Sequence, residues 1–255
     1  MKKIKILILA FLILISNTIF SYATTKYDSN IFDKIRVDVQ NKKVKTEFQL
    51  KKGQDIDYLK EMLAYLMNND GDASFNVKGW KMITRGQDAT VEYGYQMSQA
   101  QLTELDRFIE EVLQGKNFKD DFEKIKFVHD FIVSQYRYDT EKVPSTAYDI
   151  YIKGYGVCSG YTQLGKLFFD KLGIENKVVI GFAKEPHTWN MVKIGEKWYH
   201  VDITWDDPIV KGRENIGITS YEYFLISEDS IKKDHTFLEE FYPRAVEDYL
   251  VLPKR

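Results

Sequence analysis

The feature that most constrains the fold of this chain is a pair of strand-like runs separated by only two residues. Residues 187–194 and 197–205 read as strands, and Gly195-Glu196 lies between them. Glycine at the first central position is typical of a type II′ turn, which joins two antiparallel neighbours. The sequence therefore predicts an antiparallel hairpin whose register is fixed by the length of its turn.

This register brings a histidine close to an aspartate. With a two-residue turn Ile194 faces Lys197, and counting back places Trp189 opposite Asp202. His187 then lies two residues from Trp189 on the same face, diagonal to Asp202. Diagonal neighbours have Cβ atoms about 7 Å apart, within reach of an imidazole–carboxylate hydrogen bond. A turn with an odd number of residues would send the two side chains to opposite faces.

The only cysteine lies upstream, in a glycine-rich run that leads into a predicted helix. Cys158 lies within residues 154–160, and Gly173 ends the helical pattern that follows. The apolar face of this helix consists of Leu164, Leu167, Phe168 and Leu172. We expect Cys158 at or just before the helix N-terminus, where free N–H groups and the helix dipole lower the pKa of a thiol. The alternative is a buried cysteine that acts as a small hydrophobe.

Cys158, His187 and Asp202 together provide a nucleophile, a base and a residue that orients the base. Covalent acyl transfer needs this combination, because the thiol attacks a carbonyl while the imidazole takes or already holds its proton. The carboxylate fixes the tautomer of the ring and stabilises the imidazolium. The free N–H groups at the start of the helix are ready donors for the oxyanion that forms.

The N-terminus predicts export. Residues 1–5 are rich in lysine, residues 6–15 are apolar, and Ser21-Tyr22-Ala23 offers small residues at the positions that a signal peptidase reads. The apolar run is too short for a comfortable membrane span. We therefore predict a cleaved signal peptide over residues 1–23 and a secreted or cell-surface protein without a stable membrane span. The alternative is an uncleaved N-terminal anchor.

The rest of the chain predicts an α+β protein in two parts. We expect a small α+β N-terminal domain over residues 24–115 and a catalytic domain over residues 116–255. In the first part, residues 35–39 and 44–50 alternate like two strands, and a helical pattern follows from Ile56. A hydrophobic content of 44% with 15% aromatic residues supports a packed core.

Three motifs in chain order resemble those of the transglutaminase-like superfamily. They are the runs over residues 156–161, 187–190 and 198–208. The resemblance covers roughly residues 120–210, extends toward residues 221–225, and leaves the N-terminal segment without a match. It implies a papain-like core, in which the helix that bears the cysteine packs on an antiparallel sheet that bears the histidine and the aspartate.

The resemblance also implies the roles of Cys158 as nucleophile, His187 as base and Asp202 as orienting residue. The expected activity is acyl transfer through a thioester on a glutamine side chain or a peptide bond, with cross-linking, deamidation or hydrolysis as the outcome. A cysteine peptidase of surface protein or wall peptide is an alternative, and so is a non-catalytic surface module that keeps the fold. The large β domains of animal transglutaminases are absent, so the resemblance supports no substrate class or calcium dependence.

Three aromatic residues are candidates for binding the substrate, namely Trp189, Tyr155 and Tyr138. Either tyrosine is also a candidate for the second oxyanion donor. The protein or peptide that these residues would bind is the one partner we expect. The formal charge of −2 becomes −5 without Lys2, Lys3 and Lys5, and no basic block is present, so nucleic-acid binding is not expected.

The remaining histidines and acidic residues of this region are interpreted as structural. His129 is expected to be packed or at the surface, His200 to lie on the face of the triad, and His235 to lie in a charged, surface-like segment. Asp206 and Asp207 predict a turn. No HExxH-like or histidine-rich cluster is present, so neither a metal nor a cofactor is predicted.

Overall fold

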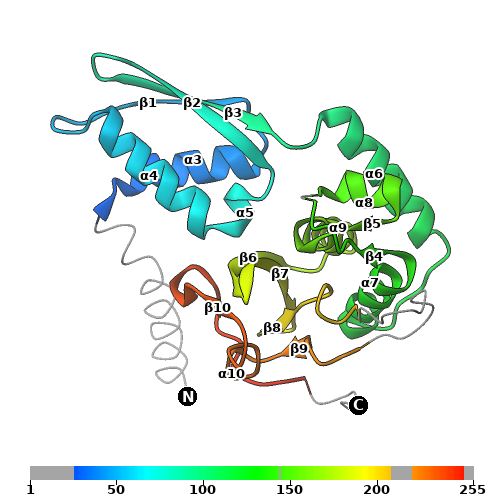
Figure 1. Cartoon of the computed structure of the whole chain (residues 1–255). Helices are drawn as coiled ribbons and strands as arrows, with labels where there is room; N and C mark the ends of the chain where they lie inside the picture. Colours follow the sequence, from blue (N-terminus) through cyan, green and yellow to red (C-terminus); the bar gives the residue numbers. More distant parts are fainter. Residues whose placement is uncertain (1–25, 144, 208–219, 250–255) are drawn as a thin grey trace, which may run out of the picture. The chain divides into compact units, whose positions relative to one another are not determined.

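The computed structural model describes residues 26–143, 145–207 and 220–249. The predicted signal peptide, residues 1–23, lies outside the described residues. Within the described part of the chain, no helix is both long and apolar enough to cross a membrane. Contacts divide the chain into two compact units, which Figure 1 traces in chain order. One comprises the described residues up to Gly94 with Leu238–Pro243, and the other comprises Tyr95–Phe237 with the residues from Arg244 onward.

The division falls at Gly94 and not at residue 115, where we expected it. Helix α6 (Gln99–Leu113) lies between the two positions and belongs to the second unit. Its residues Leu105 and Ile109 are buried in the core of that unit. Ser98 caps α6 as the sequence predicts, through a capping box.

The first unit combines helices with a three-stranded antiparallel sheet of order β1-β3-β2. Its elements are α3 (Ser29–Gln40), β1 (Lys45–Gln49), α4 (Ile56–Asn69), α5 (Gly71–Ser74), β2 (Val77–Arg85) and β3 (Asp88–Tyr95). The predicted strand over residues 35–39 is wrong, because this segment is part of α3. Ile31, Ile35 and Val39 are buried at helical spacing, and Asp28 caps the helix. The alternation of apolar and polar residues within residues 35–39 is therefore too short to make this segment a strand, and the segment follows the helical period.

The second unit is built around a five-stranded antiparallel sheet of order β10-β6-β7-β8-β9. Its strands are β6 (Asn176–Ala183), β7 (Glu185–Ile194), β8 (Lys197–Val201), β9 (Phe224–Ile226) and β10 (Thr236–Phe237). Its further elements are α6, α7 (Asp121–Gln135), β4 (Arg137–Tyr138), α8 (Ala147–Lys153), β5 (Tyr155–Gly156), α9 (Cys158–Lys171) and α10 (Glu228–Ile231). This architecture confirms the predicted α+β class, with the helix that begins at Cys158 packed on the sheet (Figure 1).

Helix α9 lies close against strand β7 because a glycine allows the approach and two polar side chains bond across it. A Cβ atom on Gly165 would lie 2.9 Å from Oδ1 of Asn190. Nδ2 of Asn190 donates to the carbonyl oxygen of Thr162 at 3.2 Å, and Oγ1 of Thr162 donates to the carbonyl oxygen of Thr188 at 2.9 Å. These contacts fix the helix that starts at the cysteine against the strand that carries the histidine.

An apolar core also packs against α9. Leu164 and Phe168 of α9 belong to one fully buried cluster with Ile125 and Ile132 of α7 and Val192 of β7. Burying one such side chain stabilises the fold by roughly 1.5–3 kcal/mol relative to leaving it exposed. The site therefore rests on the apolar core of the second unit.

The hairpin of β7 and β8 has the predicted register. Ile194 pairs with Lys197 and Asn190 pairs with Val201, so the turn has two residues. Gly195 has a φ of +59°, as the first central residue of a type II′ turn requires. Strand β8 ends at Val201 and not at Trp205, which corrects the predicted boundary.

Strand β8 ends early because the side chain of Asp202 forms hydrogen bonds with the backbone that follows it. Oδ1 of Asp202 accepts hydrogen bonds from the N–H groups of Thr204 at 3.0 Å and Trp205 at 3.2 Å. An aspartate that bonds the backbone two and three residues ahead favours a turn over a continued strand. Residues 202–207 accordingly form a turn.

Candidate active site

Cys158 is the first residue of α9. The preceding Val157 makes no side-chain hydrogen bond as N-cap, and the first N–H groups of a helix have no partner within it. Cβ atoms on Gly156 and Gly160 would lie 2.3 and 2.6 Å from the side chain of Ile150 on α8. The glycine-rich run thus lets the start of α9 pack tightly on α8, and the thiol lies at the positive end of the helix.

His187 and Asp202 are hydrogen-bonded as the register predicts. Nε2 of His187 lies 2.7 Å from Oδ2 of Asp202, and both side chains are buried. His187 lies on β7 opposite Gly181 of β6, and Asp202 directly follows β8. The diagonal pair is therefore formed by the fixed register of two adjacent strands.

The thiol of Cys158 completes this arrangement. It is hydrogen-bonded to His187 and to Thr188. Because Nε2 of His187 is engaged with Asp202, Nδ1 is the ring nitrogen left for the sulfur. Burial raises the pKa of the thiol, but the hydrogen bond and the charge of His187 outweigh burial and lower the pKa below its ordinary value.

The electrostatics of the pair favour a charged thiolate–imidazolium form. Burial lowers the pKa of His187, but the charge and hydrogen bond of Asp202 and the contact with Cys158 raise it to about 10. Burial raises the pKa of Asp202, and the two histidines beside it, His187 and His235, hold that pKa well below its usual range. At neutral pH a thiol of lowered pKa beside a base of raised pKa is a preformed nucleophile.

A cavity of about 480 Å³ opens onto the thiol and the imidazole. Its other lining residues are Tyr138, Lys142, Ala183, Lys184, Glu185, Pro186, Thr204, Trp205 and Asp207. Burial, followed by the charges of Cys158 and nearby carboxylates, raises the pKa of Tyr138 to about 12. Its hydroxyl group is therefore protonated across the neutral range and is an available hydrogen-bond donor beside the sulfur.

The three aromatic candidates for substrate binding are placed differently by the structure. Tyr138 lines the cavity. Tyr155 is exposed and does not line it. Trp189 is 1% exposed, and its Nε1 donates to Nδ1 of His200 at 2.9 Å, so it cannot contact a substrate and supports the sheet instead. The tryptophan that lines the cavity is Trp205.

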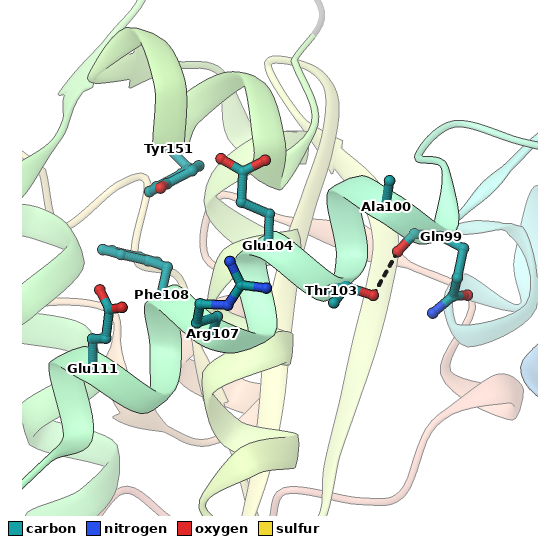
Figure 2. A pocket seen from close by; sticks show the side chains of 8 residues that line it. All are labelled: Gln99, Ala100, Thr103, Glu104, Arg107, Phe108, Glu111 and Tyr151. Atoms are coloured by element: carbon teal, nitrogen blue, oxygen red, sulfur yellow. Dashed lines mark hydrogen bonds between the residues drawn. The ribbon is translucent and has the colours of Figure 1, made fainter.

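A second cavity, of about 580 Å³, lies along helix α6 and contains none of these groups. Its lining residues are Gln99, Ala100, Thr103, Glu104, Arg107, Phe108, Glu111 and Tyr151 (Figure 2). The ring of Phe108 packs on Tyr151 with centroids 4.6 Å apart, and Glu104 accepts from the hydroxyl of Tyr148 at 2.8 Å. No cysteine, serine or histidine lies among these lining residues, and we therefore place the chemistry at Cys158.

His235 is the residue of the site that the sequence analysis missed. It was expected in a surface-like segment, but the structure buries it completely beside the pair. Its Nε2 lies 3.1 Å from Oδ2 of Asp202, and its Nδ1 lies 2.6 Å from Oδ1 of Asp234. The sequence around His235 does not indicate this position, because the pairing of β10 with β6 brings the residue beside Asp202.

The other predicted structural residues anchor the turn that carries Asp202. His129 is fully buried, and its Nε2 lies 3.1 Å from Oδ2 of Asp206. Oδ2 of Asp207 accepts from the hydroxyl of Tyr161 at 2.6 Å. Asp206 and Asp207 thus belong to the predicted turn and tie it to α7 and α9.

His187, Asp202 and His235 also form a group of potential metal ligands. One ligand atom from each lies within 4.8 Å of the other two, the only such group of three among the described residues. Hydrogen bonds between these atoms account for their closeness, and Asp202 and His235 do not line the cavity. We therefore assign them to a hydrogen-bonded chain and not to a metal site.

Comparisons with known proteins are consistent with this site. Residues 108–203 match the family model of the transglutaminase-like superfamily. This range contains Cys158, His187 and Asp202. No curated protein matches the sequence.

Three solved structures resemble parts of the chain. A candidate cysteine protease of Cytophaga hutchinsonii is 13% identical over 49% of this chain and 61% of its own, with a TM-score of 0.35. A structure named as a TGase is 14% identical over 68% of this chain and 53% of its own, with a TM-score of 0.39. A candidate protease of Parabacteroides distasonis is 12% identical over 48% of this chain and 35% of its own, with a TM-score of 0.30. The chain thus spans less than two thirds of each of these structures.

The family match and the geometry agree on the same segment. Helix α9, strand β7 with His187, and Asp202 directly after strand β8 all lie within the matched range. Residues 108–203 therefore resemble the transglutaminase-like superfamily, and they belong to an α+β unit in which helix α9 packs on an antiparallel sheet.

Proposed function

We propose that this protein is an extracytoplasmic, cysteine-dependent acyl-transfer enzyme that acts on protein or peptide amides through a thioester. The observation that carries the proposal is the hydrogen-bonded series of the half-buried Cys158 and the buried His187 and Asp202, with the thiol and the imidazole lining a cavity. Export is supported by the lysine-rich start, the apolar run and the small residues over positions 1–23.

In the first step the thiolate of Cys158 attacks the carbonyl carbon of a carboxamide. A carbon–sulfur bond forms, and the carbonyl electrons move to the oxygen. The free N–H groups at the start of α9 would donate hydrogen bonds to this oxyanion, and the hydroxyl of Tyr138 is the candidate for a further donor. The carbon–nitrogen bond then breaks, and His187 gives its proton to the leaving amine or ammonia.

In the second step an amine or water attacks the thioester. His187, now neutral, takes a proton from the attacking group, and the thiolate of Cys158 leaves. An amine acceptor gives cross-linking, and water gives deamidation or peptide hydrolysis. Asp202 keeps the His187 ring oriented through both steps and offsets the charge of the imidazolium.

A non-catalytic module that merely keeps the fold would not need this electrostatic arrangement. Burying an imidazole and a carboxylate beside a half-buried thiol is costly unless each group is paired. Here all three are paired with one another, and the thiol and the imidazole face the cavity. This favours catalysis over binding alone.

The test is capture of the thioester. The protein is incubated with a panel of peptides that contain glutamine and with a primary amine, quenched in acid, and analysed by intact-mass spectrometry. We expect a mass increase confined to Cys158 and absent in Cys158→Ala, followed by amide or acid product. Product formation by Cys158→Ala at the wild-type rate would contradict the proposal.

A further inference from the structure

His235 joins the proposed triad to a second carboxylate. Its buried ring lies directly before β10, 3.1 Å from Oδ2 of Asp202 through Nε2 and 2.6 Å from Oδ1 of Asp234 through Nδ1. The same Oδ2 of Asp202 lies 2.7 Å from Nε2 of His187. A continuous series of hydrogen bonds therefore runs from Cys158 through two imidazoles and the carboxylate between them to Asp234, whose side chain is partly exposed.

Counting protons defines the state of the His235 ring. An ionised carboxylate only accepts hydrogen bonds, and a neutral imidazole has a single N–H. Oδ1 of Asp202 accepts from two backbone N–H groups, and Oδ2 of Asp234 accepts from the hydroxyl of Tyr223 at 2.5 Å. Both aspartates thus act as acceptors, and the two contacts of His235 with them require a proton on each ring nitrogen.

We propose that His235 is a positioning residue that bridges Asp202 and Asp234 as a doubly protonated imidazolium. The proposal rests on the proposed roles of Cys158, His187 and Asp202 and deepens them. The charges would then alternate along the series, from the thiolate of Cys158 to the carboxylate of Asp234. Each buried charge has an opposite charge beside it, which offsets the cost of removing it from water.

The groups around the ring are compatible with a positive charge there. The ring centroids of His187, Trp189, Trp205 and Tyr223 lie 5.5, 5.1, 4.6 and 5.4 Å from that of His235. Burial, followed by the charges of His235 and Lys232, lowers the pKa of His200 to about 3, so that histidine is neutral. Burial and Asp234 raise the pKa of Tyr223, so its hydroxyl stays a donor.

The expected effect of this positive charge is to lower the pH at which its neighbours titrate. Removing it makes the local potential more negative, and that raises the pKa of Cys158 and of His187 together. At about 5 Å in a partly buried site, one unit charge shifts a titration by roughly one pH unit or more. The sign of the shift therefore distinguishes a charged His235 from a neutral one.

The state of the ring is read directly from the nitrogen and proton spectra of histidine side chains labelled with ¹⁵N. The chain has four histidines, and His200 is an internal reference because its Nδ1 accepts from Trp189. At pH 7 we expect both nitrogens of His235 to carry protons, with the signals assigned by their loss in His235→Gln. One unprotonated nitrogen on His235 would overturn the proposal.

The consequence for the site is measured by the pH midpoint of Cys158 alkylation with iodoacetamide. Asp234→Asn and His235→Gln are both expected to raise the midpoint by about one pH unit. In Asp234→Asn the partly exposed residue changes while the fold is kept, and the ring loses the carboxylate that supports its second proton. Asp229→Asn, an exposed residue of α10, removes the same charge and is expected to leave the midpoint unchanged.

The outcomes separate the two proposals. If His235 is neutral, Asp234→Asn removes only a negative charge, and the midpoint falls or stays where it is, which would overturn the role of His235. If the wild-type midpoint itself lies at the value of a free thiol, the proposed triad fails. Neither result needs a substrate.

Discussion

His129 and His235 have the same kinds of hydrogen-bond partner, but only His235 lies beside the proposed catalytic residues. Each ring contacts the aspartate next to it in sequence through Nδ1, at 3.1 Å for Asp130 and 2.6 Å for Asp234. Each contacts an aspartate of the turn over residues 202–207 through Nε2, at 3.1 Å in both cases. Each outer aspartate also accepts from a tyrosine hydroxyl, Tyr221 at 2.9 Å and Tyr223 at 2.5 Å.

The difference lies in the second partner of the turn aspartate. Asp206, which contacts His129, also accepts from the backbone N–H of Tyr223. Asp202, which contacts His235, also contacts His187 and through it the thiol. The same arrangement of residue types thus anchors the turn at His129 and lies beside a reactive group at His235. The pattern of residue types is the same in both places. Closeness to Cys158 therefore decides which histidine we assign to the reaction and which to the structure.

The largest effect is expected from Cys158→Ala. Turnover should be abolished because no thioester can form, while the cooperative unfolding transition and the circular dichroism spectrum should match those of the wild type. The measurement is product formation with the peptide panel of the capture experiment. Activity within a few-fold of wild type would remove the cysteine from the reaction.

Exchanging a carboxylate for an amide at each end of the turn tests the comparison itself. Asp202→Asn should lower turnover by on the order of 10⁴-fold, as for the corresponding change in a serine protease, because the His187 ring loses its orientation. Asp206→Asn should leave turnover within a few-fold, since its partner His129 does not reach the thiol. The comparison breaks if Asp206→Asn abolishes turnover in a folded protein and Asp202→Asn does not.

The stability cost of Asp206→Asn should be about 3 kcal/mol and should depend on pH. Burial lowers the pKa of His129, but its hydrogen bonds with Asp130 and Asp206 raise it above 6.5. A raised pKa in the folded state adds stability that is fully present below the pKa of the unfolded state and is lost as the pH rises through the folded value. Urea unfolding of wild type and Asp206→Asn should therefore differ most below pH 6.5 and converge at higher pH. A difference that grows with pH would contradict this.

A smaller effect on stability, with a readout at the thiol, is expected from Gly181→Ala. A Cβ atom there would lie 2.3 Å from the carbonyl oxygen of Thr236, so β10 must shift and His235 with it. We expect a loss of about 1–3 kcal/mol and a rise in the alkylation midpoint. Gly94→Ala is the matched control, because its Cβ atom would meet only Gly79 at an ordinary 3.6 Å. Equal effects of the two variants on the thiol would argue against a role for β10.

The sequence was sufficient for the pair of His187 and Asp202 because a two-residue turn fixes the register over the whole hairpin. It was sufficient for Cys158 because glycines before an apolar helical pattern mark a helix start. Both are local rules. The strand predicted over residues 35–39 was wrong because these five residues continue a longer helical period that begins at Ile31. A short alternation of apolar and polar residues is not enough to predict a strand.

His235 and Trp189 could not be placed by such rules. The order of β10 beside β6 brings a residue near the C-terminus to the triad, and no spacing within residues 229–237 indicates that. Trp189 has the right position along β7, but its burial depends on Gly181, which leaves room for its ring, and on β10. Both placements depend on the order of strands in the sheet. Local sequence patterns do not predict that order.

The proposed function requires that His187 and Asp202 hold Cys158 as a thiolate. The most direct measurement is the pH dependence of iodoacetamide alkylation of the wild-type protein, which has a single cysteine and needs no substrate. We expect a midpoint well below the value near 8.5 of a free thiol, and we expect His187→Ala to raise it. A midpoint at or above 8.5, unchanged in His187→Ala, would contradict it.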